Sequence, residues 1–386
     1  MQLVFSDAQY WEDFLPLTFT RPVAEMRMGI LTFTERWQKL LEIDEVFYIT
    51  ENYLQEKFPK PESKQSLFIV PNFFPSDEVL EQIRALQPGE ALVYDNEVLV
   101  ANINMENFSL NQISKMTDIT EKLLFIEKPT DIFSHNDFAI NFDFALVTKG
   151  KTSQALSSTN GFIGEKENLF IEEGATVEFS TLNCKTGKIY IGKNAEIMEG
   201  SNIRGSLALC EDSKINLGTK LYGGTTIGPH CKVGGEVNNI VIFGYSNKGH
   251  DGFLGNSVIG EWCNLGADTN SSNLKNNYAS VKLWNYRKKR FLDTGLQFCG
   301  LIMGDHSKTA INTQLNTGTI VGVASNIFKP GFPPNLVDSF SWGGMKGDEQ
   351  FRLDKAYEVA EKAMERRKIP LTETDKDILK YIYNEF

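Results

Sequence analysis

The sequence predicts three successive parts: an α/β domain over residues 1–150, a β-solenoid over residues 151–344 and a helical tail over residues 345–386. The first observation behind this is that aliphatic residues recur every six positions through the middle of the chain. The second is that short apolar runs alternate with helical patterns before residue 150, and the third is helical spacing of apolar residues after residue 345. With 386 residues and 41% apolar content, the chain is long enough for two or three domains with sizeable cores.

The six-residue repeat is the strongest pattern in the chain. It fits neither a helix, with a period of 3.6, nor a strand, with a period of 2. The repeat slips around NNIVIFGYSNKG and is interrupted again after residue 265. Its members are Ile191, Ile197, Ile203, Leu209, Ile215, Leu221, Ile227 and Val233, then Phe253, Ile259 and Leu265, then Met303, Thr309, Leu315, Val321 and Ile327.

A triangular β-solenoid explains this period. Each unit of six residues makes one short strand and one turn, and three units make one coil of eighteen residues. The aliphatic residue then points into the prism and stacks on its equivalent in the next coil, while glycine and asparagine occupy the corners. A β-sandwich with fortuitously aligned strands is the alternative, and eight consecutive aliphatic matches make it improbable.

The terminal parts lack the six-residue repeat. Residues 1–150 contain the apolar runs Leu3-Phe5, Leu67-Val70, Ala91-Tyr94 and Leu123-Ile126. They also contain the segment TFTERWQKLLEI, in which Thr32 and Glu35 have the spacing of a capping box. The stretch TKGKTSQALSSTNG, poor in large apolar residues, marks the boundary near residue 150. In the tail we expect two packing helices without chemistry, with one face formed by Leu353, Ala356, Tyr357, Ala360 and Met364 and another by Ile378, Leu379 and Ile382.

Composition narrows the classes of function and location. A formal charge of -11 argues against a nucleic-acid surface, but local cations and backbone amides can still bind phosphorylated substrates. The five cysteines are scattered and form no C-x-x-C pair, which is typical of the reducing cytoplasm and excludes a disulfide framework. The sequence shows no secretion signal and no run of 18 apolar residues. We therefore expect a cytoplasmic protein that does not bind a membrane.

His250 is the first candidate for chemistry. It lies in a break of the repeat, among Gly249, Asp251 and Gly252, so we expect an exposed loop position. A lone histidine is usually structural. Near neutral pH, however, an exposed imidazole is suited to remove a proton from an attacking amine or hydroxyl.

The segment GHDGFLGNSVIGEWCNLGADTNSSN resembles the acetyltransfer segment of bacterial bifunctional enzymes that make UDP-N-acetylglucosamine. Those enzymes join an N-acetylglucosamine-1-phosphate uridylyltransferase to a glucosamine-1-phosphate N-acetyltransferase. The family's histidine, aromatic residue and two asparagines fall on His250, Phe253, Asn264 and Asn273, with phenylalanine where the family usually has tyrosine. The hexapeptide repeat is similar to that of left-handed β-helix acyltransferases, and the resemblance implies a left-handed parallel β-helix.

The resemblance also implies a mechanism. His250 would be the general base toward the amine of glucosamine-1-phosphate, and Asn264 and Asn273 would orient the sugar. Lys275 or Lys282 would pair with the sugar phosphate, and Lys232 is a looser candidate. Acetyl-CoA would lie near Gly300, Ala310 and Ala324, no metal is required for this step, and a homotrimer is expected.

Purely structural interpretations of the asparagines and of the insertion remain open beside these functional roles. The asparagines are also typical corner residues of a solenoid. The basic and aromatic insertion Asn273 to Phe291 suits capture of phosphates or adenine, but it is equally a solvated loop over one solenoid face.

In the N-terminal part, LPLTFTRPVAEMRMGILTFTERW resembles the start of sugar nucleotidylyltransferases, and IEKP at residues 126–129 is similar to another motif of that family. The resemblance implies that Arg21 and Arg27 bind nucleotide phosphates of UTP or dTTP. The segment FSDAQYWEDF replaces the family's glycine-rich loop, so the backbone cannot approach a triphosphate in the usual way. Asp7 is either a Mg²⁺ ligand or a turn former.

Three functions therefore remain open. The first is a bifunctional enzyme that acetylates glucosamine-1-phosphate and transfers a nucleotidyl group, and it is favoured by His250 and its asparagines. The second is a sugar-1-phosphate thymidylyltransferase with the solenoid as an oligomerisation scaffold. The third is a non-catalytic regulatory solenoid that binds sugar nucleotides, an interpretation favoured for the N-terminal part by the missing glycine loop.

Overall fold

The computed structural model describes residues 1–106 and 108–386. The chain forms two compact units, one of residues 1–14, 20–26 and 31–127 and the other of residues 15–19, 27–30 and 128–386. The units meet in sequence between Glu127 and Lys128, whereas the sequence places a boundary at residue 150. The difference arises because α3 (Pro129–Ser134) and α4 (Asn136–Thr148) pack on the solenoid strands. The side-chain amide of Asn136 secures α4, since it donates to the carbonyl of Gly224 at 2.9 Å.

The first unit is an α/β layer with a mixed six-stranded sheet in the order β4-β1-β5-β8-β7-β9. The predicted capping box is confirmed, because Thr32 and Glu35 bond each other's backbone at the start of the first helix. The principal elements of the first unit are β1 (Gln2–Ser6), β3 (Leu31–Thr32), α1 (Phe33–Leu41), β4 (Val46–Ile49), β5 (Gln65–Ile69), β6 (Phe73–Phe74), α2 (Asp77–Ala85), β7 (Glu90–Tyr94), β8 (Glu97–Asn104), β9 (Lys115–Asp118) and β10 (Leu124–Phe125).

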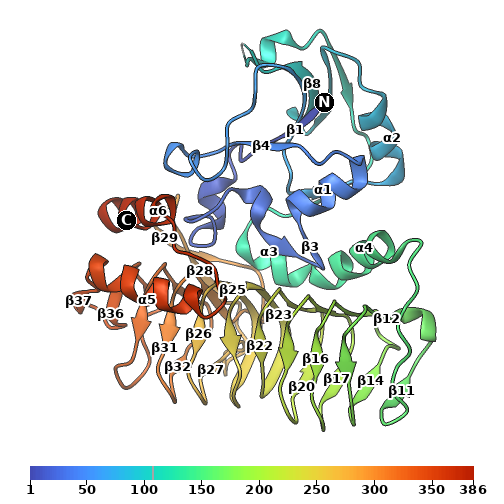
Figure 1. Cartoon of the computed structure of the whole chain (residues 1–386). Coiled ribbons are helices and arrows are strands. Elements are labelled where there is room, and N and C mark those ends of the chain that lie inside the picture. Colours follow the sequence, from blue (N-terminus) through green and yellow to red (C-terminus); the bar gives the residue numbers. More distant parts are fainter. Residues whose placement is uncertain (107) are drawn as a thin grey trace. The chain divides into compact units, whose positions relative to one another are not determined.

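The second unit contains β2 (Arg27–Met28) and a parallel β-solenoid with three ladders of stacked strands, which confirms the predicted fold class (Figure 1). We call the ladders faces 1, 2 and 3 in chain order within a coil. Face 1 comprises β11 (Gly161–Ile163), β14 (Thr181–Asn183), β17 (Asn202–Arg204), β20 (Lys220–Tyr222), β27 (Asn270–Ser271) and β32 (Gln314–Leu315). Face 2 comprises β12 (Leu169–Ile171), β15 (Ile189–Ile191), β18 (Leu207–Leu209), β21 (Thr225–Ile227), β30 (Leu301–Met303), β33 (Thr319–Val321) and β35 (Leu336–Val337).

Two nine-residue strands, β23 (Glu236–Gly244) and β25 (Phe253–Glu261), pair with both face 1 and face 2. Face 3 comprises β13 (Thr176–Val177), β16 (Glu196–Ile197), β19 (Lys214–Ile215), β22 (Lys232–Val233), β24 (Asn247–Lys248), β26 (Asn264–Leu265), β31 (Lys308–Thr309), β34 (Asn326–Ile327), β36 (Ser341–Gly343) and the antiparallel β37 (Glu349–Gln350). A hairpin of β28 (Lys282–Asn285) and β29 (Arg290–Asp293) interrupts the coils after β27. The strand arrangement is consistent with a left-handed β-helix.

The inward positions of the solenoid follow the six-residue repeat. All eight residues from Ile191 to Val233 are buried in one core, as predicted. In the next run Ile259 and Leu265 are also in this core, but the assignment of Phe253 is wrong. Leu254 takes the inward position instead, because it pairs with Val237 of the preceding coil, and Phe253 is only half-buried.

The slip in the repeat is a shortened coil. Ile227 pairs with Ile242, fifteen positions later, whereas Leu209 pairs with Ile227, eighteen positions later. On face 3 the same shortening pairs Val233 with Lys248. A lysine that is 1% exposed therefore occupies a position that aliphatic residues occupy in most other coils.

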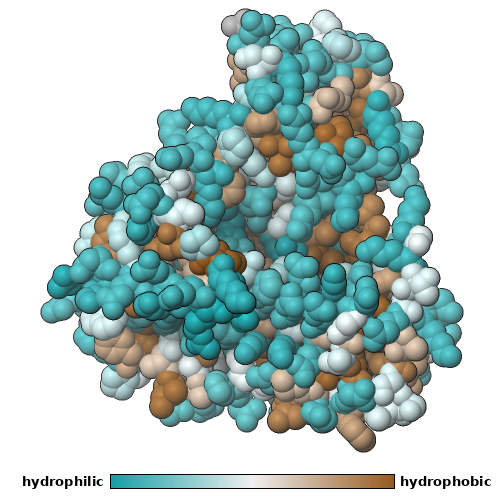
Figure 2. Space-filling view, viewed as in Figure 1, coloured by the Kyte–Doolittle hydropathy of each residue, from teal (hydrophilic) through white to brown (hydrophobic). Residues whose placement is uncertain are grey.

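The tail forms the two predicted helices, α5 (Leu353–Glu365) and α6 (Glu373–Glu385). Ala360 and Met364 of α5 form a small core with Trp262 and Leu371, and Ile378, Leu379 and Ile382 of α6 are buried as predicted. The surface in view is mainly polar, with separate apolar patches along the edge where the solenoid turns lie (Figure 2). Exposed apolar residues at such turns include Phe179, Leu217 and Ile311.

Candidate functional site

The turn that carries His250 connects β24 to β25, and His250 is exposed as predicted. Two side chains hold the backbone of this turn. The amide of Asn216 donates to the carbonyl of Gly249 at 2.7 Å, and the Lys248 Nζ donates to the carbonyl of His250 at 2.5 Å. The turn of the preceding coil packs against it at Gly235, where a Cβ would lie 2.9 Å from the His250 oxygen.

Lys248 reaches this turn from the interior of the prism. Its Nζ also donates to the carbonyl of Asp251 at 3.2 Å. Burial lowers the pKa of Lys248 from 10.5 to about 8, while the negative charges of Asp251 and Asp268 act in the opposite direction. The side chain thus links the core to the backbone of the histidine turn, so we consider it a positioning residue.

A cavity of about 720 Å³ opens beside His250 on face 3. It brings together three residues predicted from the sequence: His250, Asn264 and Lys232. The cavity is also lined by Lys308, Arg366 and Arg367, which the sequence analysis missed. Lys308 carries a signal in the repeat, since it precedes an inward residue as Lys232 and Asn264 do. The two arginines carry no such signal.

The floor of this cavity is an outward-facing row on successive strands of face 3. Strand register places Lys232 beside Asn247, Asn247 beside Asn264, and Asn264 beside Lys308. Burial lowers the pKa of Lys308, whose Nζ donates to the carbonyl of His306 at 2.8 Å. The side-chain oxygen of Asn247 is buried without a hydrogen-bond partner among the described residues.

One wall of the cavity is a row of aromatic corner residues covered by α5. Tyr245 stacks on His230 with ring centroids 4.9 Å apart and on Trp262 with centroids 4.3 Å apart. The apolar face of α5 packs on Trp262, and Arg367 donates to the carbonyl of His230 at 2.8 Å. The last turn of α5 is therefore held at the edge of the cavity.

The other predicted substrate residues do not line this cavity. Phe253 and Asn273 lie close together around Gly255, where a Cβ would come within 2.7 Å of both side chains. Asn273 donates to the side-chain oxygen of Asn256 at 2.8 Å. Lys275 and Lys282 belong to the insertion, and the Nζ of Lys275 donates to the carbonyl of Ser280 at 2.7 Å.

The residues predicted to bind acetyl-CoA lie at three different places on the solenoid. Gly300 is buried just before face 2, with the carbonyl of Gly255 2.1 Å from the position of a Cβ. Ala324 is a buried corner residue with a φ of 55°. Ala310 is half-buried and directly precedes Ile311, which lines the cavity.

The predicted nucleotide-binding residues of the N-terminal part are engaged in the fold. Arg21 is 5% exposed, and the guanidinium of Arg27 donates to the carbonyls of Ile30 and Phe243 within the solenoid unit. The two oxygens of Asp7 accept hydrogen bonds from Val23 and Thr50, and burial raises the pKa of this carboxyl to about 7. The geometry therefore supports Asp7 as a structural residue and does not fit a Mg²⁺ ligand.

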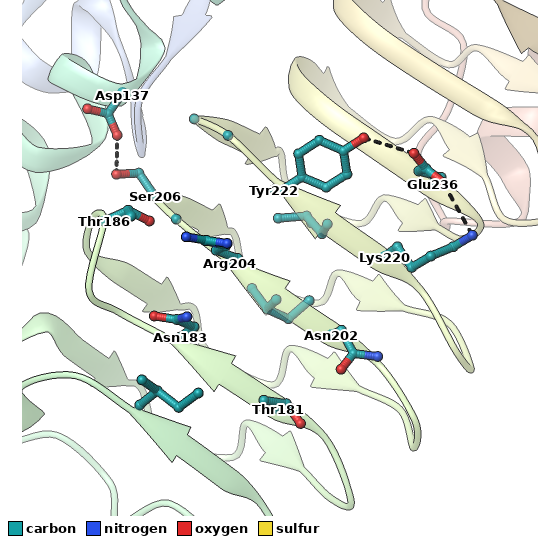
Figure 3. A pocket seen from close by; sticks show the side chains of 16 residues that line it. Asp137, Thr181, Asn183, Thr186, Asn202, Arg204, Ser206, Lys220, Tyr222 and Glu236 are labelled. Atoms are coloured by element: carbon teal, nitrogen blue, oxygen red, sulfur yellow. Dashed lines mark hydrogen bonds and ion pairs between the residues drawn. The ribbon is translucent and has the colours of Figure 1, made fainter.

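Two further cavities contain none of the predicted site residues. A groove of about 810 Å³ on face 1 holds Arg204 and Tyr222, and Tyr222 bonds Glu236, which also pairs with Lys220 (Figure 3). A cavity of about 320 Å³ in the first unit is lined by aromatic rings and by the carboxylates Asp95, Glu97 and Glu127. Such a lining repels a triphosphate.

Residues 1–106 and 108–386 lack two features, a membrane-spanning helix and a metal-binding cluster. None of the helices in this part of the chain is both long and apolar enough to span a membrane. The same residues contain no group of three or more His, Cys, Asp or Glu side chains placed to hold a metal ion.

Comparisons with known proteins agree with this architecture. Residues 2–152 match the family model described as sugar nucleotidyl transferase. A bifunctional sugar-1-phosphate nucleotidylyltransferase/acetyltransferase of Sulfurisphaera tokodaii is 31% identical over 144 residues, which cover 37% of this chain and 35% of the relative. A bifunctional protein GlmU of Methanocaldococcus jannaschii is 36% identical over 87 residues, which cover 22% of this chain and 21% of the relative.

A GlmU protein of Trichodesmium erythraeum is 29% identical over 135 residues, which cover 34% of this chain and 24% of the relative. The chain thus spans only about a third or less of the length of the curated relatives it matches. Residues 2–152 are thus similar to the sugar nucleotidyl transferase family, and parts of the chain are similar, at low identity, to bifunctional nucleotidylyltransferase/acetyltransferases.

Proposed function

We propose that this chain transfers an acetyl group from acetyl-CoA to the amine of glucosamine-1-phosphate at the cavity beside His250. The observation that carries the proposal is an exposed histidine on a rigidly held turn, facing a cavity that also holds Asn264 and several cations. The names of the similar proteins, one of which is a bifunctional nucleotidylyltransferase/acetyltransferase, support the same reaction class.

The proposed chemistry uses His250 as the general base. As the amine nitrogen attacks the acetyl carbonyl, an imidazole nitrogen takes one amine proton, the C–S bond breaks, and coenzyme A leaves as the thiol after protonation. Asn264, which lies on the floor of the cavity, would orient the sugar hydroxyls. Asn273 would act in this site only if a second copy supplied it, because it does not line the cavity of its own chain.

We also propose a homotrimer, for which the family resemblance is the support. Exposed apolar residues at the solenoid turns supply surface for contacts between copies. Light scattering on the purified chain tests this, and a monomer at micromolar concentration would remove the proposed role of Asn273.

Nucleotidyl transfer by the N-terminal domain is a second candidate function. The match of residues 2–152 to sugar nucleotidyl transferases favours it, with UTP or dTTP as donor. The absent glycine loop and the engaged residues Arg21, Arg27 and Asp7 favour instead a domain that binds sugar nucleotides without turnover.

A product assay separates these functions. The chain is incubated with glucosamine-1-phosphate and acetyl-CoA, and then with each nucleoside triphosphate and Mg²⁺ in turn. We expect acetylated sugar phosphate from the first mixture, and its absence would refute the acetyltransferase proposal. His250→Ala is expected to lower the acetylation rate by about 10²- to 10⁴-fold.

The matched control is His135→Ala, which removes a histidine at the junction of α3 and α4, outside the cavity. Because His250 is exposed, its removal should change the free energy of unfolding by no more than about 0.5 kcal/mol. Normal acetylation by His250→Ala would exclude the proposed base.

A further inference from the structure

The cavity beside His250 has an unusual charge for this protein. The whole chain carries a formal charge of -11, with 50 acidic residues. Among the described residues that line the cavity, none is Asp or Glu, whereas Lys232, Lys308, Arg366 and Arg367 supply four cations. A concentration of unneutralised positive charge in a concave site is suited to an anionic ligand.

The side chains of two of these cations have no partner among the described residues. Neither the ammonium of Lys232 nor the guanidinium of Arg366 makes a hydrogen bond or an ion pair with a described residue. Some surface lysines elsewhere on the solenoid are paired, as Lys214 is with Glu196 and Lys220 with Glu236, whereas the side chains of Lys193 and Arg204 pair with no described residue. What distinguishes the cavity is that several cations gather in one concave site whose described lining contains no carboxylate.

The strand register fixes how far the floor reaches. Lys232 and Lys308 stand at the two ends of a row with Asn247 and Asn264 between them. Adjacent strands are about 4.8 Å apart, so the Cα atoms of the two lysines are separated by about 14 Å. A small ligand centred on the asparagines therefore reaches one lysine, and a longer one with several phosphates reaches both.

The α5 helix brings the two arginines to the same cavity from a distant part of the sequence. Its apolar contacts with Trp262 fix its position, and the bond of Arg367 to the carbonyl of His230 fixes its end. The half-charge of a helix C-terminus disfavours an anion, but two full guanidinium charges outweigh it. Guanidinium groups also bind phosphate oxygens in pairs of hydrogen bonds.

We propose that Arg366 and Arg367, which directly follow α5, form a phosphate-binding site beside His250 together with one of the two floor lysines, Lys232 or Lys308. The ligand class is a phosphate monoester, because four cations and no carboxylate are found among the described residues that line the cavity. The C-terminal end of α5 then belongs to the binding site. Identifying that phosphate with a substrate rests on the proposed acetyl transfer, where either the sugar phosphate or the 3′-phosphate of coenzyme A supplies it.

Isothermal titration calorimetry on the full chain tests the site with four probes: glucosamine-1-phosphate, glucosamine, coenzyme A and 3′-dephospho-coenzyme A. Arg366→Ala is the test variant, because the guanidinium of Arg366 has no partner to lose among the described residues. Lys362→Ala is the matched control, since it removes one cation from the same helix outside the cavity. Circular dichroism on both variants checks that α5 is retained.

We expect Arg366→Ala to weaken binding of one phosphorylated probe by about tenfold, a typical loss for a charged hydrogen bond in a partly exposed site. Binding of the unphosphorylated counterpart to Arg366→Ala should change by less than twofold. Binding of every probe to Lys362→Ala should also change by less than twofold. Weaker binding of glucosamine-1-phosphate by Arg366→Ala assigns the site to the sugar phosphate. Weaker binding of coenzyme A, with unchanged binding of its dephospho form, assigns the site to the 3′-phosphate of the cofactor.

The proposal is overturned if the wild type binds neither phosphorylated probe, or if Arg366→Ala binds both as tightly as the wild type. The two proposals fail separately. If acetylation proceeds with unchanged KM values in Arg366→Ala, the acetyltransferase stands and this site falls. If the wild type binds a phosphorylated probe through Arg366 but acetylates nothing, the site stands and the acetyltransferase falls.

Discussion

Replacing Lys248 with methionine tests whether a buried lysine holds the histidine turn. Methionine keeps the length and apolar stem of the side chain and removes its charge and donors. Lys248 is 1% exposed, pairs in register with Val233, and donates to the carbonyls of His250 and Asp251. The variant should therefore remain folded and lose part of its acetyl transfer, because the turn is no longer fixed.

The lowered pKa of Lys248 gives the size of the effect that its charge has on the free energy of unfolding. The charged form is disfavoured in the folded state, where the pKa is about 8 rather than 10.5. Between these values the unfolded chain binds more protons, so the free energy of unfolding rises with pH. The charged lysine costs about 3 kcal/mol at pH 7, and the wild type should recover about 2 kcal/mol of this between pH 7 and pH 9.5.

Urea unfolding at several pH values between 7 and 9.5 measures this effect. Subtracting the free energy of unfolding of Lys248→Met from that of the wild type removes the contributions of the other titrating groups. This difference should shift in favour of the wild type by about 2 kcal/mol over that range. Lys214→Met, which removes a lysine from the outer side of face 3, provides the baseline. Parallel curves for wild type and Lys248→Met would refute the reasoning.

Three other predictions concern the parts of the fold around the sites. In the wild type the carboxyl of Asp7, with a pKa raised to about 7, becomes neutral in the fold between pH 8 and pH 5, which should raise the free energy of unfolding by about 3 kcal/mol. Asp7→Asn should abolish this gain, and urea titrations at both pH values measure it. Gly235→Ala should lower the free energy of unfolding by more than about 1 kcal/mol and reduce acetylation, since its φ is 79° and a Cβ would press on the His250 carbonyl; unfolding and product assays report both effects. Trp262→Ala should cost about 3–5 kcal/mol and loosen α5 around Met364, and hydrogen exchange of α5 amides that stays as slow as in the wild type would contradict it.

The repeat predicted most of the solenoid because one physical constraint acts at every coil. A residue that points into a narrow prism must be apolar and of limited size, so Ile191 to Val233 could be assigned to the core without a structure. The capping box at Thr32 and the buried face of α6 were predictable for a similar reason, since helix ends and amphipathic faces depend on neighbours in the sequence.

The candidate site was only partly predictable, because it combines residues distant in the sequence. His250 could be placed on an exposed turn from its glycine neighbours, and Asn264 and Lys232 line the same cavity, while their roles stay predictions. Arg366 and Arg367 reach this cavity only through the tertiary packing of α5, which no local pattern records. The roles proposed for Lys275 and Lys282 depended on the resemblance alone, and these residues lie in the insertion.

The failure of the repeat near residue 240 has a direct connection with the site. Counting by six from Val233 reaches Asn239 and Tyr245, so Lys248 could not be recognised as an inward residue. The structure shows that the coil is three residues shorter there, and this shortening brings Lys248 under the floor of the cavity and puts Gly249 at the corner before His250. A regular coil would place an aliphatic residue beneath the turn, with no donor for its carbonyls. The local departure from the repeat is therefore what ties the histidine turn to the solenoid core, and a break in a regular pattern is the place where a functional constraint is expected to override packing.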